Sequence, residues 1–208
     1  MADSYLYDVF LSYKRNPPVE PWVKQFFLPN FRDWLKEEIG GAPPRIFFDQ
    51  ECIDWGEKWK DKLQEALHSS KVLLAVCSPS YFRSPWCCFE WETFALREQV
   101  MGGSRRLRIP ITHNDGKHFP KDARDLQSMD FSDCVSVMPA FPNHPKAMIL
   151  EEKIRELVPA IARALEDAPK FQHSWPMAEF AEDIRILIGS SVIEPDDISD
   201  VSSQLLTL

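Results

Sequence analysis

The sequence predicts an α/β domain in which a parallel sheet of five strands, in the order 2-1-3-4-5, carries helices on both faces. Short apolar runs rich in strand-forming residues alternate along the chain with longer segments whose apolar residues recur at helical spacing. Such alternation is typical of parallel sheets covered on both faces, and their crossovers are right-handed. Because the first run lies next to the amino terminus, a flavodoxin-like order is favoured, with a crevice between the first and third strands.

The strands are expected where apolar runs are bounded by turn residues. Tyr7–Tyr13 is the first, and Lys14-Arg-Asn-Pro-Pro18 ends it. Pro110 lies inside the fourth and indicates an edge position or a bulge, because proline cannot donate a ladder hydrogen bond. The later strands are expected at residues 45–48, 72–77, 107–111 and 129–131.

The helices are expected at residues 21–39, 59–68, 86–100 and 146–164. Pro29 can divide the first of these, and Gly40-Gly41 ends it. Ser84 is a natural N-cap for the third helix, and Pro85 suits a first helical position, whose N–H needs no partner.

The chain is expected to divide after residue 168. Residues 1–168 form the domain, and residues 169–208 are expected to be a docked linker, a short helix at 177–188 and an acidic, serine-rich tail. Such an ending suits either a tether to a further domain or a disordered terminus.

Composition excludes several classes of function. A net charge of −8 argues against a nucleic-acid groove, and Arg105-Arg106-Leu-Arg108 is interpreted as a solvated strand entrance rather than a binding patch. No charged-then-apolar leader and no run of ~20 apolar residues occur, so neither secretion nor a membrane span is expected. The five cysteines and five histidines lack metal-site spacing, and free thiols fit the cytoplasm.

The most informative stretch is Ser84-Pro-Trp-Cys-Cys-Phe-Glu90, which follows the third predicted strand. Trp86 and Glu90 stand four residues apart and share a face of the predicted helix. By position alone, Glu90 is explained as a partner for the helix dipole, and Trp86 as an anchor of the helix to the sheet. Cys87 is expected to be buried, whereas Glu92 is expected on another face in solvent.

Three segments together resemble a TIR (Toll/interleukin-1 receptor) domain. The first is Tyr7-Asp-Val-Phe-Leu-Ser-Tyr-Lys-Arg15, and the second is Phe47-Phe-Asp49 with Gly56-Glu57 and a serine, Ser69, before an apolar strand. The third is Ser78-Pro-Ser-Tyr-Phe-Arg-Ser-Pro-Trp-Cys-Cys-Phe-Glu90, which resembles the family's SPxYxxSxWCxxE stretch. The match is close over the first half of the chain and only architectural from 107 to 165. Its compact loops resemble those of bacterial members.

The resemblance implies an NAD glycohydrolase. Enzymatic TIR domains cleave NAD to nicotinamide and either ADP-ribose or a cyclic isomer, using the glutamate that corresponds here to Glu90. NAD would be the substrate and not a cofactor; none of the seven glycines forms a GxGxxG motif, so redox binding of NAD is not expected. The resemblance also implies activation by self-association, a sensor domain or partner protein, and an immune or anti-phage cell-suicide role.

Several residues are expected to contact the substrate around Glu90. Ser12, Lys14 and Arg15 could bind the pyrophosphate. The ring of Trp86 or Tyr13 could stack on nicotinamide. Asp49 could cap its loop as easily as touch the ligand. The complete expected set is Trp86, Ser12, Tyr13, Lys14, Arg15, Asp49, Trp55 and Ser84.

The alternative is a non-catalytic scaffold that self-associates through the loop from Asp49 to Glu57. Glu90 in register favours the enzyme, because a scaffold does not need it, although the two roles are compatible. A flavodoxin-like electron carrier lacks support, since the loops are not the Ser/Thr/Gly-rich cradles that a flavin phosphate needs.

Overall fold

The structure, a computed structural model, describes residues 4–48, 59–103, 106–114, 116 and 119–180. Its centre is a five-stranded parallel sheet in the order β2-β1-β3-β4-β5, which confirms the predicted flavodoxin-like topology. The strands are β1 (Tyr7–Tyr13), β2 (Ile46–Phe47), β3 (Ser70–Cys77), β4 (Arg108–Thr112) and β5 (Met129–Asp130).

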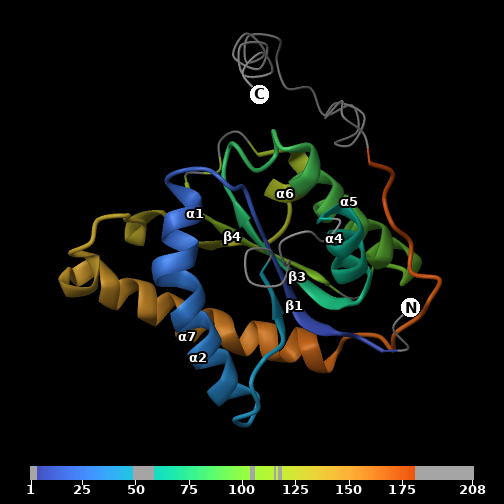
Figure 1. Cartoon of the computed structure of the whole chain (residues 1–208), viewed down its shortest axis with the longest axis horizontal. Helices are drawn as coiled ribbons and strands as arrows, with labels where there is room; N and C mark the ends of the chain where they lie inside the picture. Colours follow the sequence, from blue (N-terminus) through green and yellow to red (C-terminus); the bar gives the residue numbers. More distant parts are fainter. Residues whose placement is uncertain (1–3, 49–58, 104–105, 115, 117–118, 181–208) are drawn as a thin grey trace, which may run out of the picture.

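Helices cover both faces of the sheet. In Figure 1, α1, α2 and α7 lie on one side of the strands, and α4 and α5 lie on the other. The elements between and after the strands are α1 (Val19–Trp22), a π-helical turn (Val23–Phe27), α2 (Leu28–Glu38), α4 (Trp59–His68), α5 (Pro85–Val100), α6 (Lys121–Arg124), two 3₁₀ turns (Ser132–Cys134 and Phe141–Asn143) and α7 (Pro145–Glu166).

The first helical segment is interrupted one turn earlier than Pro29. The backbone N–H of Leu28 donates to the carbonyl of Val23, five residues back, which defines the π-helical turn. Pro29 then occupies the first turn of α2, where its missing N–H is tolerated. Gly40, with a φ of +85°, follows the helix end as predicted.

Pro110 does not lie in an edge strand of the sheet, because β4 has neighbours on both sides. At Pro110 itself, however, β4 resembles an edge strand. Pro110 pairs with Ala75 of β3, whereas β5 reaches only the last two residues of β4, Ile111 and Thr112. At Pro110 the side of β4 away from β3 therefore carries no ladder, and the missing N–H costs no strand pairing.

The middle of the sheet positions the candidate site. Ser12 pairs with Ala75 and Tyr13 with Val76, so β1 and β3 end together at the same edge. Almost all residues of both strands are buried, which explains why they are continuous apolar runs rather than alternating ones. α5 begins at this edge, and its first turns therefore lie beside the end of β1.

Residues 169–180, here called the C-terminal strap, cross the side of the molecule that carries α4 and α5 (Figure 1). The backbone N–H of Ala178 donates to Thr93 Oγ1 of α5 at 3.1 Å, and Trp175 is buried. The helix expected at 177–188 is not present at residues 177–180, which have no regular secondary structure; the rest of it lies outside the described residues. The backbone of the strap is instead engaged with α5.

Among the described residues, no helix is both long enough and apolar enough to cross a bilayer.

Candidate active site around Glu90

Glu90 lies at the edge of a small pocket where β1 ends. The pocket is narrow and partly open, with about 190 Å³ of space that includes open solvent, and Glu90 itself is only 7% exposed. Carboxylates are seldom buried to this degree without a partner. The residues that line the pocket are Phe10, Leu11, Ser12, Tyr13, Phe47, Leu63 and Glu90.

A buried hydroxyl supplies a partner for the Glu90 carboxylate. Ser12 Oγ donates to Glu90 Oε2 at 2.5 Å and lies 2.7 Å from the phenolic oxygen of Tyr81. Ser12 and Tyr81 are 1% and 0% exposed. The site therefore contains a continuous line of three polar groups within an apolar wall.

The other residues expected after β1 occupy different positions. Tyr13 lines the pocket and stacks on Phe48, with ring centroids 5.5 Å apart. Lys14 is half-buried, whereas Arg15 is exposed and its guanidinium lies 5.5 Å from the ring centroid of Trp59. Neither of the two basic side chains lines the pocket.

Trp86 is not among the residues that line the pocket. Its ring lies against three aromatic rings, those of Trp59, Phe89 and Phe180, with centroid separations of 4.6, 5.9 and 4.3 Å. The structure therefore separates Trp86 from Glu90, although they are four residues apart on α5. These rings belong to α4, α5 and the C-terminal strap, so the contacts join α5 to its neighbours rather than to the sheet, where Trp86 was expected to anchor it.

Ser84 is buried at the N-cap position of α5, where its carbonyl accepts from the N–H of Cys88 at 3.0 Å. Its side chain makes no capping hydrogen bond. The remaining expected contacts, Asp49 and Trp55, lie outside the described residues.

Two side chains close to Glu90 on α5, those of Cys87 and Glu92, have raised pKa values. Burial, followed by the nearby Glu90 carboxylate, raises the pKa of the Cys87 thiol well above its usual range, so a thiolate nucleophile is disfavoured. The expectation that Glu92 is simply solvated is wrong. Burial and the charge of Asp122 raise the pKa of Glu92 to about 7, although Arg108 opposes the shift.

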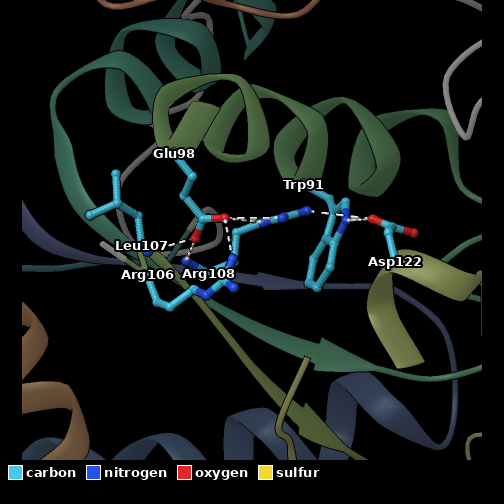
Figure 2. A network of polar contacts seen from close by, with 6 residues as sticks. All are labelled: Trp91, Glu98, Arg106, Leu107, Arg108 and Asp122. Atoms are coloured by element: carbon cyan, nitrogen blue, oxygen red, sulfur yellow. Dashed lines mark hydrogen bonds and ion pairs between the residues drawn. The ribbon is translucent and has the colours of Figure 1, made fainter. Parts of the chain in front are cut away.

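A polar network fixes α5 to the sheet (Figure 2). The Glu98 carboxylate accepts from the backbone N–H groups of Leu107 and Arg108 at 2.7 and 2.9 Å, and from the Arg108 guanidinium at 3.0 and 3.1 Å. Trp91 Nε1 and the Arg108 guanidinium both reach Asp122, at 2.9 and 3.5 Å. The Arg108 side chain, 9% exposed, is therefore a structural cation and not part of the solvated strand entrance expected from the sequence, whereas Arg106 is exposed as expected.

The comparison with protein families decides the identity of this fold. A family model described as TIR domain matches residues 9–136, more than half of the chain. The chain belongs to the TIR domain family. No curated protein sequence is significantly similar to it.

Solved TIR domains show weak similarity to this TIR domain. The TIR domain of the Toll-related receptor TRR-2 from Hydra magnipapillata is 21% identical, with a TM-score of 0.45, and the match covers 72% of this chain and 98% of that one. The TIR domains of the activated Roq1 resistosome, which directly recognizes the pathogen effector XopQ, are 16% identical, with a TM-score of 0.37, and the match covers 77% of this chain and 95% of theirs.

Three contributors to the site in this TIR domain were not anticipated. Tyr81 was not expected at the site, although its place in the Ser78–Glu90 motif was a usable signal. Glu98 lies outside all the motifs identified in the sequence. Phe180 covers Trp86 from the C-terminal strap, and no local pattern links two residues so far apart in the sequence.

Proposed function

We propose that this TIR domain hydrolyses NAD at the bond between nicotinamide and ribose, with Glu90 as the catalytic carboxylate. The observation that carries the proposal is a buried carboxylate at a pocket, oriented by the Ser12 hydroxyl, at the glutamate position of the family motif. Burial of a carboxylate is costly unless the group is paired, and a buried carboxylate beside a cavity is typical of functional sites.

The reaction requires a negatively charged group near the ribose, whereas it does not require a proton donor for the leaving group. The C–N bond breaks with its electron pair leaving on nicotinamide, which departs as a neutral molecule. Positive charge develops at the ribose carbon, and the Glu90 carboxylate stabilises it. Water then attacks that carbon and releases one proton, which gives ADP-ribose; attack by a nitrogen of the adenine would give a cyclic isomer.

The pocket accommodates only part of the substrate. It is far smaller than the roughly 300–1,000 Å³ of pockets that enclose whole ligands, so at most one end of the dinucleotide would reach Glu90. Lys14 and Arg15, which directly follow the pocket residue Tyr13 in the sequence, would face the pyrophosphate, and Tyr13 offers an aromatic ring at the pocket. The remaining enclosure would come from self-association, which makes activity dependent on protein concentration.

Nicotinamide release by the purified chain tests the proposal. The assay compares wild type with Glu90→Gln, which keeps the side-chain shape, at high and low protein concentration and with and without a crowding agent. We expect release by wild type and a loss of at least about 100-fold in the variant, as for removal of a key electrostatic group. Glu92→Gln is the matched control, since it removes a nearby carboxyl that is absent from the pocket lining.

A non-catalytic TIR–TIR scaffold is the second candidate. The small pocket and the covering of Trp86 by Phe180 favour it, because both limit access for a dinucleotide. Concentration-dependent association without nicotinamide release at any concentration would support the scaffold. Equal release by wild type and Glu90→Gln would instead show that another residue performs the chemistry.

The cellular role proposed with the enzymatic function is that of a cytoplasmic immune or anti-phage effector. Depletion of NAD would then end the growth of the infected cell. Measuring cellular NAD after expression of wild type and of Glu90→Gln tests this role, and unchanged NAD with active wild-type protein would argue against it.

A further inference from the structure

Three buried polar groups from separate parts of the chain form a line that ends at Glu90. Tyr81 belongs to the connection between β3 and α5, Ser12 to β1, and Glu90 to α5. The separations are 2.7 Å from Tyr81 Oη to Ser12 Oγ and 2.5 Å from Ser12 Oγ to Glu90 Oε2. None of the three side chains is more than 7% exposed, so water competes little for these hydrogen bonds.

The chemistry of the groups sets the direction of both hydrogen bonds. An ionised carboxylate only accepts, so the single proton of the Ser12 hydroxyl points at Glu90. Ser12 must then accept from Tyr81, whose phenol donates. Burial, together with the nearby Cys87, Cys77 and Glu90, raises the pKa of Tyr81 well above 10, which keeps the phenol protonated as this arrangement requires.

We propose that Ser12 and Tyr81 are positioning residues, which hold the Glu90 carboxylate in one orientation toward the pocket. The proposal rests on the proposed cleavage of NAD. It assigns to Ser12 a role different from the pyrophosphate contact expected from the sequence, because the only proton of this 1%-exposed hydroxyl is used by Glu90.

The positioning role predicts an effect on turnover rather than on binding. A carboxylate that stabilises a developing charge acts through its distance and angle to the reacting carbon, and a misplacement of about 1 Å can cost roughly 100-fold in rate. Ground-state binding of NAD depends mainly on contacts elsewhere along the dinucleotide. Removing the Ser12 hydroxyl should therefore lower kcat and leave KM nearly unchanged.

A double-mutant cycle tests the line of hydrogen bonds with two substitutions that each delete one hydroxyl, Ser12→Ala and Tyr81→Phe. For nicotinamide release from NAD we expect kcat to fall about 10- to 100-fold in Ser12→Ala and about 3- to 10-fold in Tyr81→Phe, with KM within about twofold of wild type. Since Tyr81 acts through Ser12, the double variant should be no slower than Ser12→Ala alone.

The matched control is Ser70→Ala. Ser70 is a buried serine at the other end of β3, where its hydroxyl donates to the carbonyl of Ala66 at 2.7 Å. This variant should lose stability to a similar degree without a change in kcat per folded molecule. Circular dichroism and thermal unfolding of every variant establish the folded fraction, and Tyr81→Phe, which keeps Ser12, carries the test if Ser12→Ala does not fold.

Each outcome is decisive. Full kcat in folded Ser12→Ala, or a rise in KM at constant kcat, would overturn the positioning role while leaving Glu90 as the catalytic residue. Independent, multiplicative losses in the double variant would overturn the relay from Tyr81. An inactive wild type in clustered form would overturn the proposed function itself, and the positioning role with it.

Discussion

Phe180 of the C-terminal strap packs against Trp86 at the start of α5, with ring centroids 4.3 Å apart and ring planes inclined by 35°. The contact joins the last described residue of the chain to the tryptophan of the family motif. Phe180 also contacts Phe89 of the same helix, with ring centroids 5.8 Å apart. The strap is therefore part of the packed fold of this TIR domain.

Phe180→Ala should loosen the strap. Loss of a partly buried aromatic pair is expected to lower the free energy of unfolding by about 1 to 2 kcal/mol. Urea unfolding measures this change, and faster hydrogen exchange of the Ala178 amide, which bonds to Thr93, would localise it. Gln172→Ala changes an exposed side chain of the strap and should stay within about 0.5 kcal/mol of wild type. Equal stability of the two variants would mean that Phe180 adds nothing to docking.

Glu98→Ala should be among the most destabilising single changes in the domain. The substitution leaves the buried Arg108 guanidinium and two backbone N–H groups without their carboxylate, and such losses cost about 3 to 5 kcal/mol. Arg106→Ala is the matched comparison, because the Arg106 side chain is 64% exposed and lies 3.9 Å from the same carboxylate. It should change stability by less than about 1 kcal/mol. Similar urea midpoints for both variants would contradict this account.

Asp8 should make stability depend on pH in the acid range. Burial opposes its ionisation, but hydrogen bonds from Arg45 and Lys71 outweigh burial and lower the pKa to about 2. Because the folded-state pKa lies below the unfolded one, the stabilisation is present above about pH 4 and is lost toward about pH 2. The difference in unfolding free energy between wild type and Asp8→Asn should therefore shrink by about 2 kcal/mol across this window. A difference that stays constant from pH 5 to pH 2 would refute the assignment.

Glu92 should act in the opposite direction and at higher pH. Its folded-state pKa of about 7 lies above the unfolded value, so its contribution is fully present below about pH 4.5 and is lost as the pH rises through 7. Solvent screens this half-buried group, and the loss relative to Glu92→Gln should be about 1 to 2 kcal/mol. Urea midpoints between pH 4.5 and 7.5 measure it, and parallel curves for the two proteins would exclude a raised pKa.

Prediction from the sequence worked where one local rule sufficed. β1 and β3 are buried on both faces, so their apolar runs were clear, and the position of Ser84 and Pro85 marked the start of α5. The π-helical turn at Val23–Phe27 was not predicted, because its hydrogen-bond pattern leaves no separate periodicity. The sequence likewise did not indicate that β5 pairs with β4 only after Pro110, because this pairing depends on two segments and neither specifies it alone.

Within the site, topology carried more information than helical spacing. Neighbouring strands placed the end of β1 beside α5, and Ser12 does lie against Glu90. Spacing alone suggested that Trp86 would accompany Glu90, but residues four apart differ by about 40° around the helix axis and about 6 Å along it. That offset is enough to direct Glu90 to the pocket and Trp86 to the rings of Trp59 and Phe180.

The strap also covers part of α5. Ten residues of α5 are buried, among them Phe89 and Thr93, which the strap contacts. A second copy of the chain that approached this part of α5 would therefore meet the strap before it met the helix. An assembly that used the α5 residues beneath the strap would have to displace the strap first, and its affinity would be weakened by the free energy of strap docking.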